Sequence, residues 1–190
     1  MQYSPTVLSN QWVTATTSAN GNGGIDNQRK FKEGVAMLEK AISTYSNPLL
    51  LHLVLCASTD TTYTSFIARL CRSLKAKGIH TEYKACTELD SFKGQHVHIM
   101  LVVDTDTPGT VLEVVDKVMA SVNATQPEFR VKVCEAHRHG NQPYIALSIW
   151  TLQDAADWLS YIYKARSKPV GHRYMSSRAK GVSIGNEAFR

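Results

Sequence analysis

The sequence predicts an α+β fold in which a central, mostly antiparallel sheet of about five strands is flanked by helices. Two observations predict it. Helical and strand-like hydrophobic periods alternate along residues 28–168, and strands twice occur as neighbours joined by a short polar turn. Such neighbours pair antiparallel, and helices then cover the apolar faces of the sheet. A chain of 190 residues with 43% hydrophobic residues can bury a core of this kind.

Four helices are predicted from apolar residues at helical spacing. They cover 29–45, 61–77, 109–122 and 151–167. Pro48 ends the first helix, Gly78 ends the second and Pro108 opens the third. The spacing of Thr151 and Asp154 predicts a capping box at the start of the last helix, with Asp in place of the usual Glu.

Five strands are predicted between these helices, at 49–58, 79–89, 95–104, 128–136 and 144–150. The second and third are joined by a turn at 90–94, and the fourth and fifth by a polar turn at 138–142. Both pairs are therefore expected to form hairpins.

The two ends of the chain differ from its middle in composition. Residues 1–27 are rich in Ser, Thr, Asn, Gln and Gly without an apolar period, which predicts a flexible leader. Residues 169–190 form a basic C-terminal segment. From 164 to 190 the chain holds seven basic residues against one acidic residue. This clustering favours a polyanionic partner such as nucleic acid.

Neither a membrane span nor a secretory signal is evident in the sequence, so we expect a cytoplasmic protein with no membrane partner. The four cysteines form no C-x-x-C pair, and we expect small buried apolar side chains rather than disulfides. They are Cys56, Cys71, Cys86 and Cys134.

A histidine pair, His96 and His98, lies on the third predicted strand. Residues two apart on a strand project from one face, so the two imidazoles are neighbours and can share one metal ion. The opposite face is an apolar stripe for packing against helices, made of Val97, Ile99, Leu101 and Val103. A second pair, His137 and His139, falls at a strand end and is expected to be an exposed turn.

A carboxylate lies on the strand before the histidines. A tight hairpin can bring Glu88 beside His96 and His98, and Glu82 has the same strand parity and is the alternative. Two imidazoles and one carboxylate suit Mn²⁺ or Mg²⁺ better than a closed structural zinc site. Structural histidines and a solvated glutamate remain the competing interpretation.

Two tyrosines near the end of the last helix are expected to have different roles. Successive helical residues are about 100° apart, so Tyr161 and Tyr163 point to opposite sides. Tyr163 shares the apolar stripe and is expected in the core. Tyr161 shares the other side with Lys164, three residues on. A tyrosine beside a cation is suited to attack on a phosphodiester.

These motifs resemble the replication-initiator branch of the HUH endonucleases, found in rolling-circle plasmids, phages and small circular DNA viruses. The segment 95–100 (QHVHIM) matches the family's histidine-hydrophobic-histidine motif, and 161–164 (YIYK) matches its Tyr-x-x-Lys motif. The family's acidic ligand often precedes the histidines on the partner strand, which points to Glu88. The similarity covers about residues 48–168, and its first motif is matched only loosely by 53–58.

The resemblance implies a rolling-circle replication initiator of phage or plasmid type. Such an endonuclease nicks and rejoins single-stranded DNA at an origin or hairpin, with Tyr161 as nucleophile, Lys164 beside it and a metal held by His96, His98 and Glu88. A host helicase and polymerase would be partners. The expected DNA-binding residues are Arg166, Lys168, Arg173, Arg178 and Lys180. A single-tyrosine HUH transposase and a non-catalytic nucleic-acid-binding α/β module are the alternatives.

Overall fold

We analysed a computed structural model of the chain. It describes residues 28–56, 60–90, 94–163 and 174–177. The predicted leader at 1–27 lies outside this part of the chain, as does most of the predicted basic C-terminal segment.

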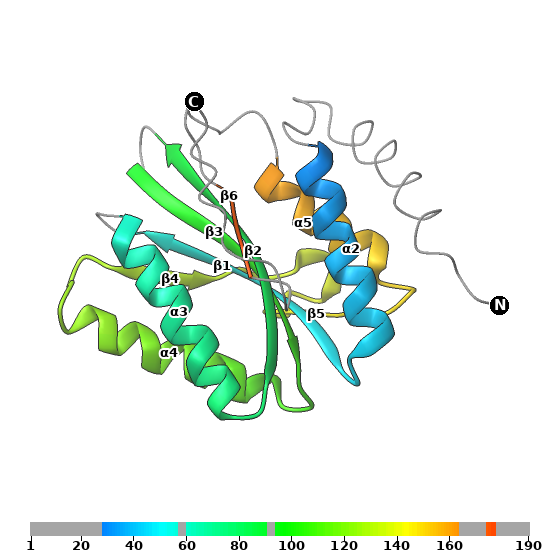
Figure 1. Cartoon of the computed structure of the whole chain (residues 1–190), viewed down its shortest axis with the longest axis horizontal. Coiled ribbons are helices and arrows are strands. Elements are labelled where there is room, and N and C mark those ends of the chain that lie inside the picture. The colour runs from blue at the N-terminus through cyan, green and yellow to red at the C-terminus, as the bar shows by residue number, and fades with distance from the viewer. Residues whose placement is uncertain (1–27, 57–59, 91–93, 164–173, 178–190) are drawn as a thin grey trace.

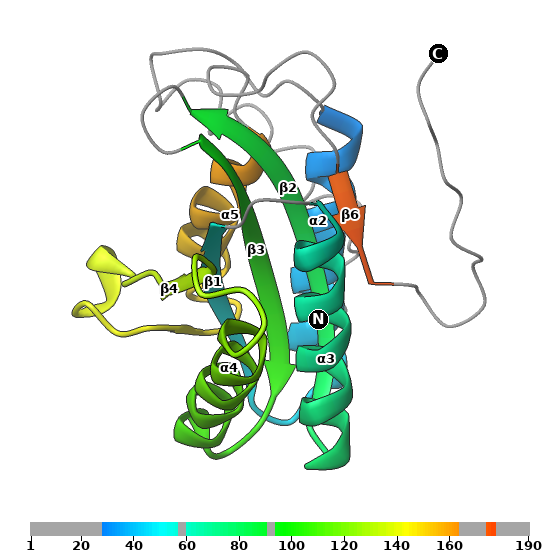
Figure 2. The same ribbon diagram turned by 90° about the vertical axis from the view of Figure 1, so that its left-hand side faces the viewer.

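The centre of the fold is an antiparallel sheet in the strand order β4-β1-β3-β2-β6, with the short β5 also paired to β1. The strands are β1 (Pro48–Cys56), β2 (His80–Asp90), β3 (Gly94–Asp104), β4 (Arg130–Val133), β5 (Ile145–Ala146) and β6 (Tyr174–Ser176). The long strands β2 and β3 run side by side through the molecule, with β6 beside β2 (Figure 2). The predicted fold class is confirmed.

Within the described residues, four α-helices cover the two faces of this sheet. They are α2 (Gln28–Thr44), α3 (Asp60–Ala76), α4 (Pro108–Asn123) and α5 (Leu152–Ser160). Helices α3 and α4 lie on one side, and α2 and α5 on the other (Figure 1). None of the helices in the described ranges is long and apolar enough to cross a membrane.

The alternation of β3 divides the interior into two cores. Ile99 and Leu101, with the neighbouring Val97 and Val103, pack against α3 and α4, as the sequence predicted. Met100 and Val102 pack on the opposite face against α2 and α5. Both faces of β3 are therefore covered, and the histidines of this strand lie at the edge of a second core rather than on an open surface.

Two predicted strands are shorter in the structure. The segments 128–136 and 144–150 form only the short strands β4 and β5. The predicted hairpin between them is wrong, because both strands pair with β1, one after the other, and the turn that joins them is closed by an isolated bridge between Ala136 and Gln142. The strand β6, which the sequence did not predict, pairs with β2 at the opposite edge.

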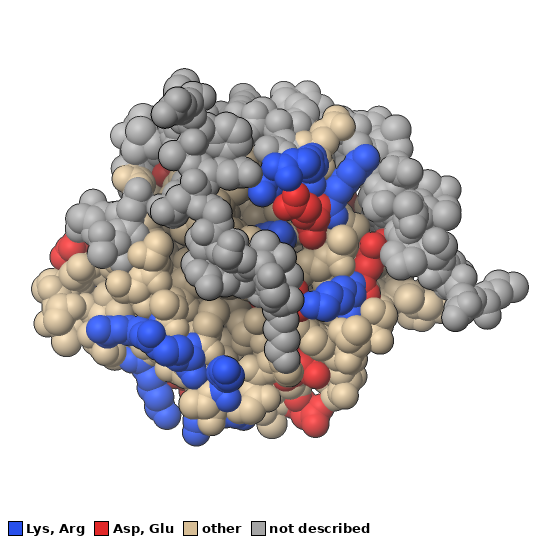
Figure 3. Space-filling model, viewed as in Figure 1, with Lys and Arg blue, Asp and Glu red and all other residues tan. Residues whose placement is uncertain are grey.

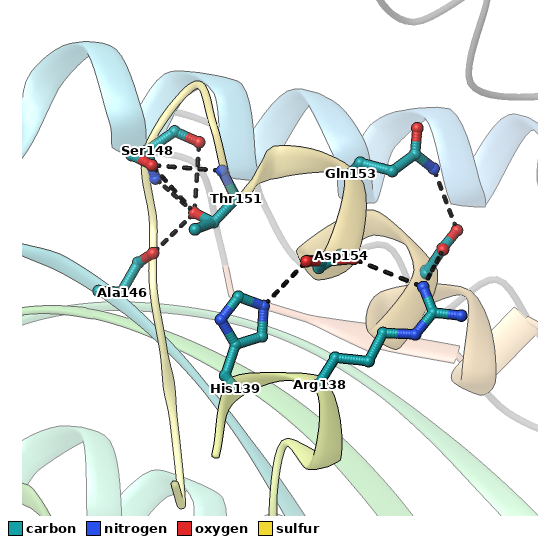
Figure 4. A network of polar contacts seen from close by, with 8 residues as sticks. Arg138, His139, Ala146, Ser148, Thr151, Gln153 and Asp154 are labelled. Atoms are coloured by element: carbon teal, nitrogen blue, oxygen red, sulfur yellow. Dashed lines mark hydrogen bonds and ion pairs between the residues drawn. The ribbon is translucent and has the colours of Figure 1, made fainter. Parts of the chain in front are cut away.

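The predicted capping box at the start of α5 is wrong. Thr151 makes no side-chain capping bond. Its hydroxyl instead donates to the carbonyl of Ala146 at 2.7 Å and accepts from the backbone N–H of Ser148 at 2.9 Å (Figure 4). Asp154 bonds to His139 and Arg138. Other partners therefore occupy both side chains: backbone groups within the preceding five residues for Thr151, and side chains of residues 138 and 139 for Asp154.

The predicted final helix is also shorter than expected. The α-helix ends at Ser160 and continues as a single 3₁₀ turn, η2 (Tyr161–Tyr163). The rest of the predicted helix, from Lys164 to Ser167, lies outside the described residues.

Helices α2 and α5 approach closely at Gly34. A Cβ atom added there would lie 2.9 Å from Leu159 Cδ2 and 3.0 Å from the Tyr163 phenolic oxygen. We expect Gly34→Ala to destabilise the protein by about 1–3 kcal/mol through overpacking, which exceeds the gain in helix propensity. Urea denaturation measures the change.

Gly109 in α4 provides the matched control. A Cβ atom there would meet nothing within 4 Å. Gly109→Ala should therefore leave stability unchanged or raise it by up to about 1 kcal/mol. Equal effects of the two substitutions would show that the contact between α2 and α5 is not tight.

Candidate functional site

The hairpin of β2 and β3 places a carboxylate beside two histidines. The antiparallel register puts Glu88 directly opposite His96 and puts Cys86 opposite His98, so the three polar side chains project from the same face. Glu88 Oε2 lies 3.5 Å from His96 Nε2 and 3.3 Å from His98 Nε2. All three residues are buried.

This group has the chemistry of a cation site. One oxygen and two nitrogen ligand atoms lie within 4.8 Å of one another, so Glu88, His96 and His98 could together hold a metal ion. Two ligands at 90° around an ion, each about 2.1 Å from it, are roughly 3 Å apart. The two carboxylate–imidazole distances are close to that spacing. A cation in this position would also offset the charge of the buried carboxylate.

The alternative ligand, Glu82, does not belong to this group. It pairs with Val102, six residues along β2 from Glu88 and toward the other end of the sheet. Its carboxylate accepts hydrogen bonds from Lys40 Nζ at 2.6 Å and from the Tyr45 hydroxyl at 3.0 Å. Glu82 is therefore part of an ion pair between β2 and α2.

Tyr161 lies against the histidines. Its ring centroid is 4.9 Å from that of His98 and 5.7 Å from that of His52. Although it contacts these buried rings, Tyr161 is 41% exposed. The turn η2 thus places a partly accessible phenol next to the group that could bind a metal.

Tyr163 lies in the core, as its helix face predicted. It is 1% exposed, meets Phe31 edge-on at 5.8 Å and stacks on Tyr174 at 5.4 Å. Burial raises the pKa of Tyr163 far above its usual range. This phenol is therefore protonated, and it is shielded from solvent, whereas Tyr161 is partly exposed.

A third histidine at the site, His52 on β1, was missed from the sequence. It is 4% exposed, and its Nε2 lies 2.9 Å from His98 Nδ1. Its ring also meets Trp158 edge-on at 5.7 Å. Burial lowers the pKa of His52 to about 3, an effect that His98 strengthens and Glu88 opposes, so this imidazole is neutral at pH 7.

One feature of the sequence could have drawn attention to His52 as a candidate site residue. It is the single polar residue in the otherwise apolar segment 48–56. Strand parity alone could not place it, because His52 comes near His98 only through the register of β1 on β3, in which Val54 is opposite His98.

The second histidine pair lies in a single 3₁₀ turn, η1 (His137–His139), in which His137 is exposed as expected and His139 is partly buried. The two rings have different partners. His137 Nδ1 bonds to Asn141 at 2.9 Å, whereas His139 Nε2 bonds to Asp154 at 3.1 Å. Arg138 between them bonds to Asp154 and Asp157 (Figure 4). This turn therefore holds α5, the helix that leads to Tyr161.

Several predicted site residues lie outside the described part of the chain. They are Lys164, Arg166, Lys168, Arg173, Arg178 and Lys180. Where side chains are described, Lys and Arg gather over α3 and beside the first turns of α2, where acidic side chains lie among them (Figure 3).

The cysteines are free, and Cys86 is buried as expected. The other three are only partly buried, and Cys71 packs against the core on the α3 and α4 side of the sheet.

Comparisons of the chain with protein-family models, curated proteins and solved structures found no match.

Proposed function

We propose that this protein is a metal-dependent enzyme that nicks and rejoins single-stranded DNA, acting as a rolling-circle replication initiator of the HUH class. The observation that carries the proposal is the position of Tyr161. Tyr161 is partly exposed, and its ring centroid lies 4.9 Å from that of His98. His98 belongs with Glu88 and His96 to the group that could hold a metal ion. A nucleophile and a cation site next to each other are the two parts that this chemistry needs.

The proposed ion is Mn²⁺ or Mg²⁺, held by Glu88, His96 and His98. Hard oxygen ligands favour these ions, and imidazole extends the choice toward Mn²⁺. A divalent cation bound there would neutralise charge on a phosphate group and polarise it.

Tyr161 would act as the nucleophile in a transesterification. Its phenolic oxygen forms a bond to the phosphorus while the bond to the 3′ oxygen of the preceding nucleotide breaks. The phenol loses its proton and the departing 3′ oxygen takes one up, so the products are a 5′-phosphotyrosine and a free 3′ hydroxyl. Attack by another 3′ hydroxyl reverses the step and rejoins the strand. No oxidant or nucleotide cofactor is needed.

The basic residues after Tyr161 complete the proposal. Lys164 follows at the spacing of the family motif and would offset negative charge on the phosphate. Arg166, Lys168, Arg173, Arg178 and Lys180 would contact the DNA backbone, which fixes position on the strand without reading its sequence.

A labelled pool of single-stranded oligonucleotides tests this function. The protein is incubated with the pool and Mn²⁺, with and without EDTA, and the products are separated under denaturing conditions. Because the linkage is to a 5′ phosphate, a label at the 3′ end should remain on the protein, and a label at the 5′ end should be released on a shorter fragment. EDTA should prevent both results.

Two outcomes would contradict the proposal. A 5′ label retained on the protein would mean the opposite polarity of cleavage. If no adduct formed while single-stranded DNA still bound, a non-catalytic nucleic-acid-binding module would be the better description of the protein.

A further inference from the structure

His52 lies behind His98, on the side away from Glu88. The hydrogen bond from one imidazole to the other uses His98 Nδ1, whereas His98 Nε2 faces the carboxylate of Glu88 at 3.3 Å. The two ring nitrogens of His98 therefore have different partners: Nδ1 contacts His52, and Nε2 belongs to the candidate metal group.

The chemistry of imidazole decides where the protons lie in this pair. A neutral imidazole has one N–H and one lone pair, and a metal ligand must offer the lone pair. If His98 binds through Nε2, its proton is on Nδ1 and is donated to Nε2 of His52. His52 then carries its own proton on Nδ1. A histidine ligand commonly donates its second N–H in this way, which fixes both its tautomer and its ring orientation.

This arrangement has a cost at His52. Its Nδ1 is buried and has no hydrogen-bond partner among the described residues. A buried polar atom without a partner lowers stability, because it loses its hydrogen bonds to water and gains none in return. An apolar side chain at this position would avoid that cost, since Leu50 on the same face packs into the core beside α2 and α5. Packing alone does not account for a histidine here.

The ring of His52 is also held in place. Trp158 meets it edge-on, with an interplanar angle of 85°, and Tyr161 lies over it with centroids 5.7 Å apart. These contacts come from α5 and η2, so the orientation of His52 depends on the same segment that carries the proposed nucleophile.

We propose that His52 is a positioning residue that accepts a hydrogen bond from His98 Nδ1 and so keeps His98 Nε2 available to a metal ion. The inference rests on the metal site of the proposed function and goes beyond it, because it assigns the acceptor that sets the tautomer of one ligand.

The protein loaded with diamagnetic Mg²⁺ provides the first test. Long-range ¹H–¹⁵N spectra of the histidine side chains distinguish the two neutral tautomers, and resonances are assigned with single histidine variants. We expect the protons of both His98 and His52 on Nδ1, which makes His52 Nε2 the acceptor. A proton on Nε2 of His52 would make His52 the donor and would overturn the proposal without any measurement of activity.

Two substitutions of His52 provide the second test, with Mn²⁺ affinity measured by calorimetry. His52→Gln can keep an acceptor near the position of Nε2, whereas His52→Phe keeps a ring but removes the acceptor. We expect Phe to weaken Mn²⁺ binding by about 10–100-fold, as loss of a ligand's hydrogen-bond partner usually does, and Gln to weaken it by no more than about threefold. Thermal unfolding without metal controls for changes in folding.

Equal losses of affinity in both variants would overturn the proposal, as would lower stability of the Phe variant with unchanged affinity. If wild-type protein bound no Mn²⁺, this inference and the proposed function would fail together. If Mn²⁺ binding depended on His52 but no DNA adduct formed, the role of His52 would be supported and only the proposed strand-transfer activity would be contradicted.

Discussion

Tyr161→Phe is expected to lower the yield of the covalent DNA adduct by about 10⁴-fold or more, because the substitution removes the only oxygen that the side chain offers as a nucleophile. The aromatic ring, which contacts His98 and His52, is retained. Mn²⁺ affinity and the unfolding temperature should therefore change little. Adduct yield is measured with the oligonucleotide labelled at its 3′ end.

Tyr163→Phe is the matched control for this prediction. Both tyrosines lie in the same 3₁₀ turn, but Tyr163 is 1% exposed and Tyr161 is 41% exposed. The Tyr163 variant should form the adduct at close to the wild-type level, with at most a modest loss of stability from the removed hydroxyl. If Tyr163→Phe abolished the adduct and Tyr161→Phe did not, the nucleophile would be the buried tyrosine.

Glu88→Gln should weaken Mn²⁺ binding by at least about 100-fold and remove adduct formation with it. Loss of a hydrogen-bond partner of a ligand already costs metal sites 10–100-fold, and Glu88 would be a ligand itself and the only anionic one of the three. Glutamine keeps the size of the side chain and can still bond to an imidazole, so the hairpin should remain folded. Calorimetry and thermal unfolding with and without Mn²⁺ measure the two effects.

The control for Glu88 lies on the same strand and the same face. Glu82→Gln removes an equal charge, but this carboxylate is paired with Lys40 and Tyr45 near the other end of the sheet. We expect Mn²⁺ affinity to be unchanged in that variant, with a small loss of stability from the weakened contact between β2 and α2. Mn²⁺ binding that depended on Glu82 and not on Glu88 would contradict the site described above.

The architecture was predictable to a large extent because the strongest signals were local. Helices α2, α3 and α4 and the long strands agree with the predicted ranges within a few residues, since hydrophobic period, proline and glycine act over short distances. The predictions were poorest at the sheet edges. There the lengths of β4 and β5 depend on how much of β1 is available to pair, and the formation of β6 depends on a partner strand far away in sequence.

The sequence by itself determined the core of the candidate site. His96 and His98 share a face because the strand period is two, and Glu88 meets them because the β2–β3 turn is short and sets the register of the hairpin. These three residues lie within eleven positions of one another, so backbone geometry alone brings them together.

The tertiary structure decided the rest of the site. His52 reaches His98 across 46 residues through the pairing of β1 with β3, and Tyr161 reaches it because α5 packs on α2. Neither contact follows from a local pattern, because each depends on which elements pack together and how far they are shifted. The physical reason is that turn residues and hydrophobic periodicity order neighbours in sequence, whereas burial of apolar surface and the pairing of strands decide which distant segments meet.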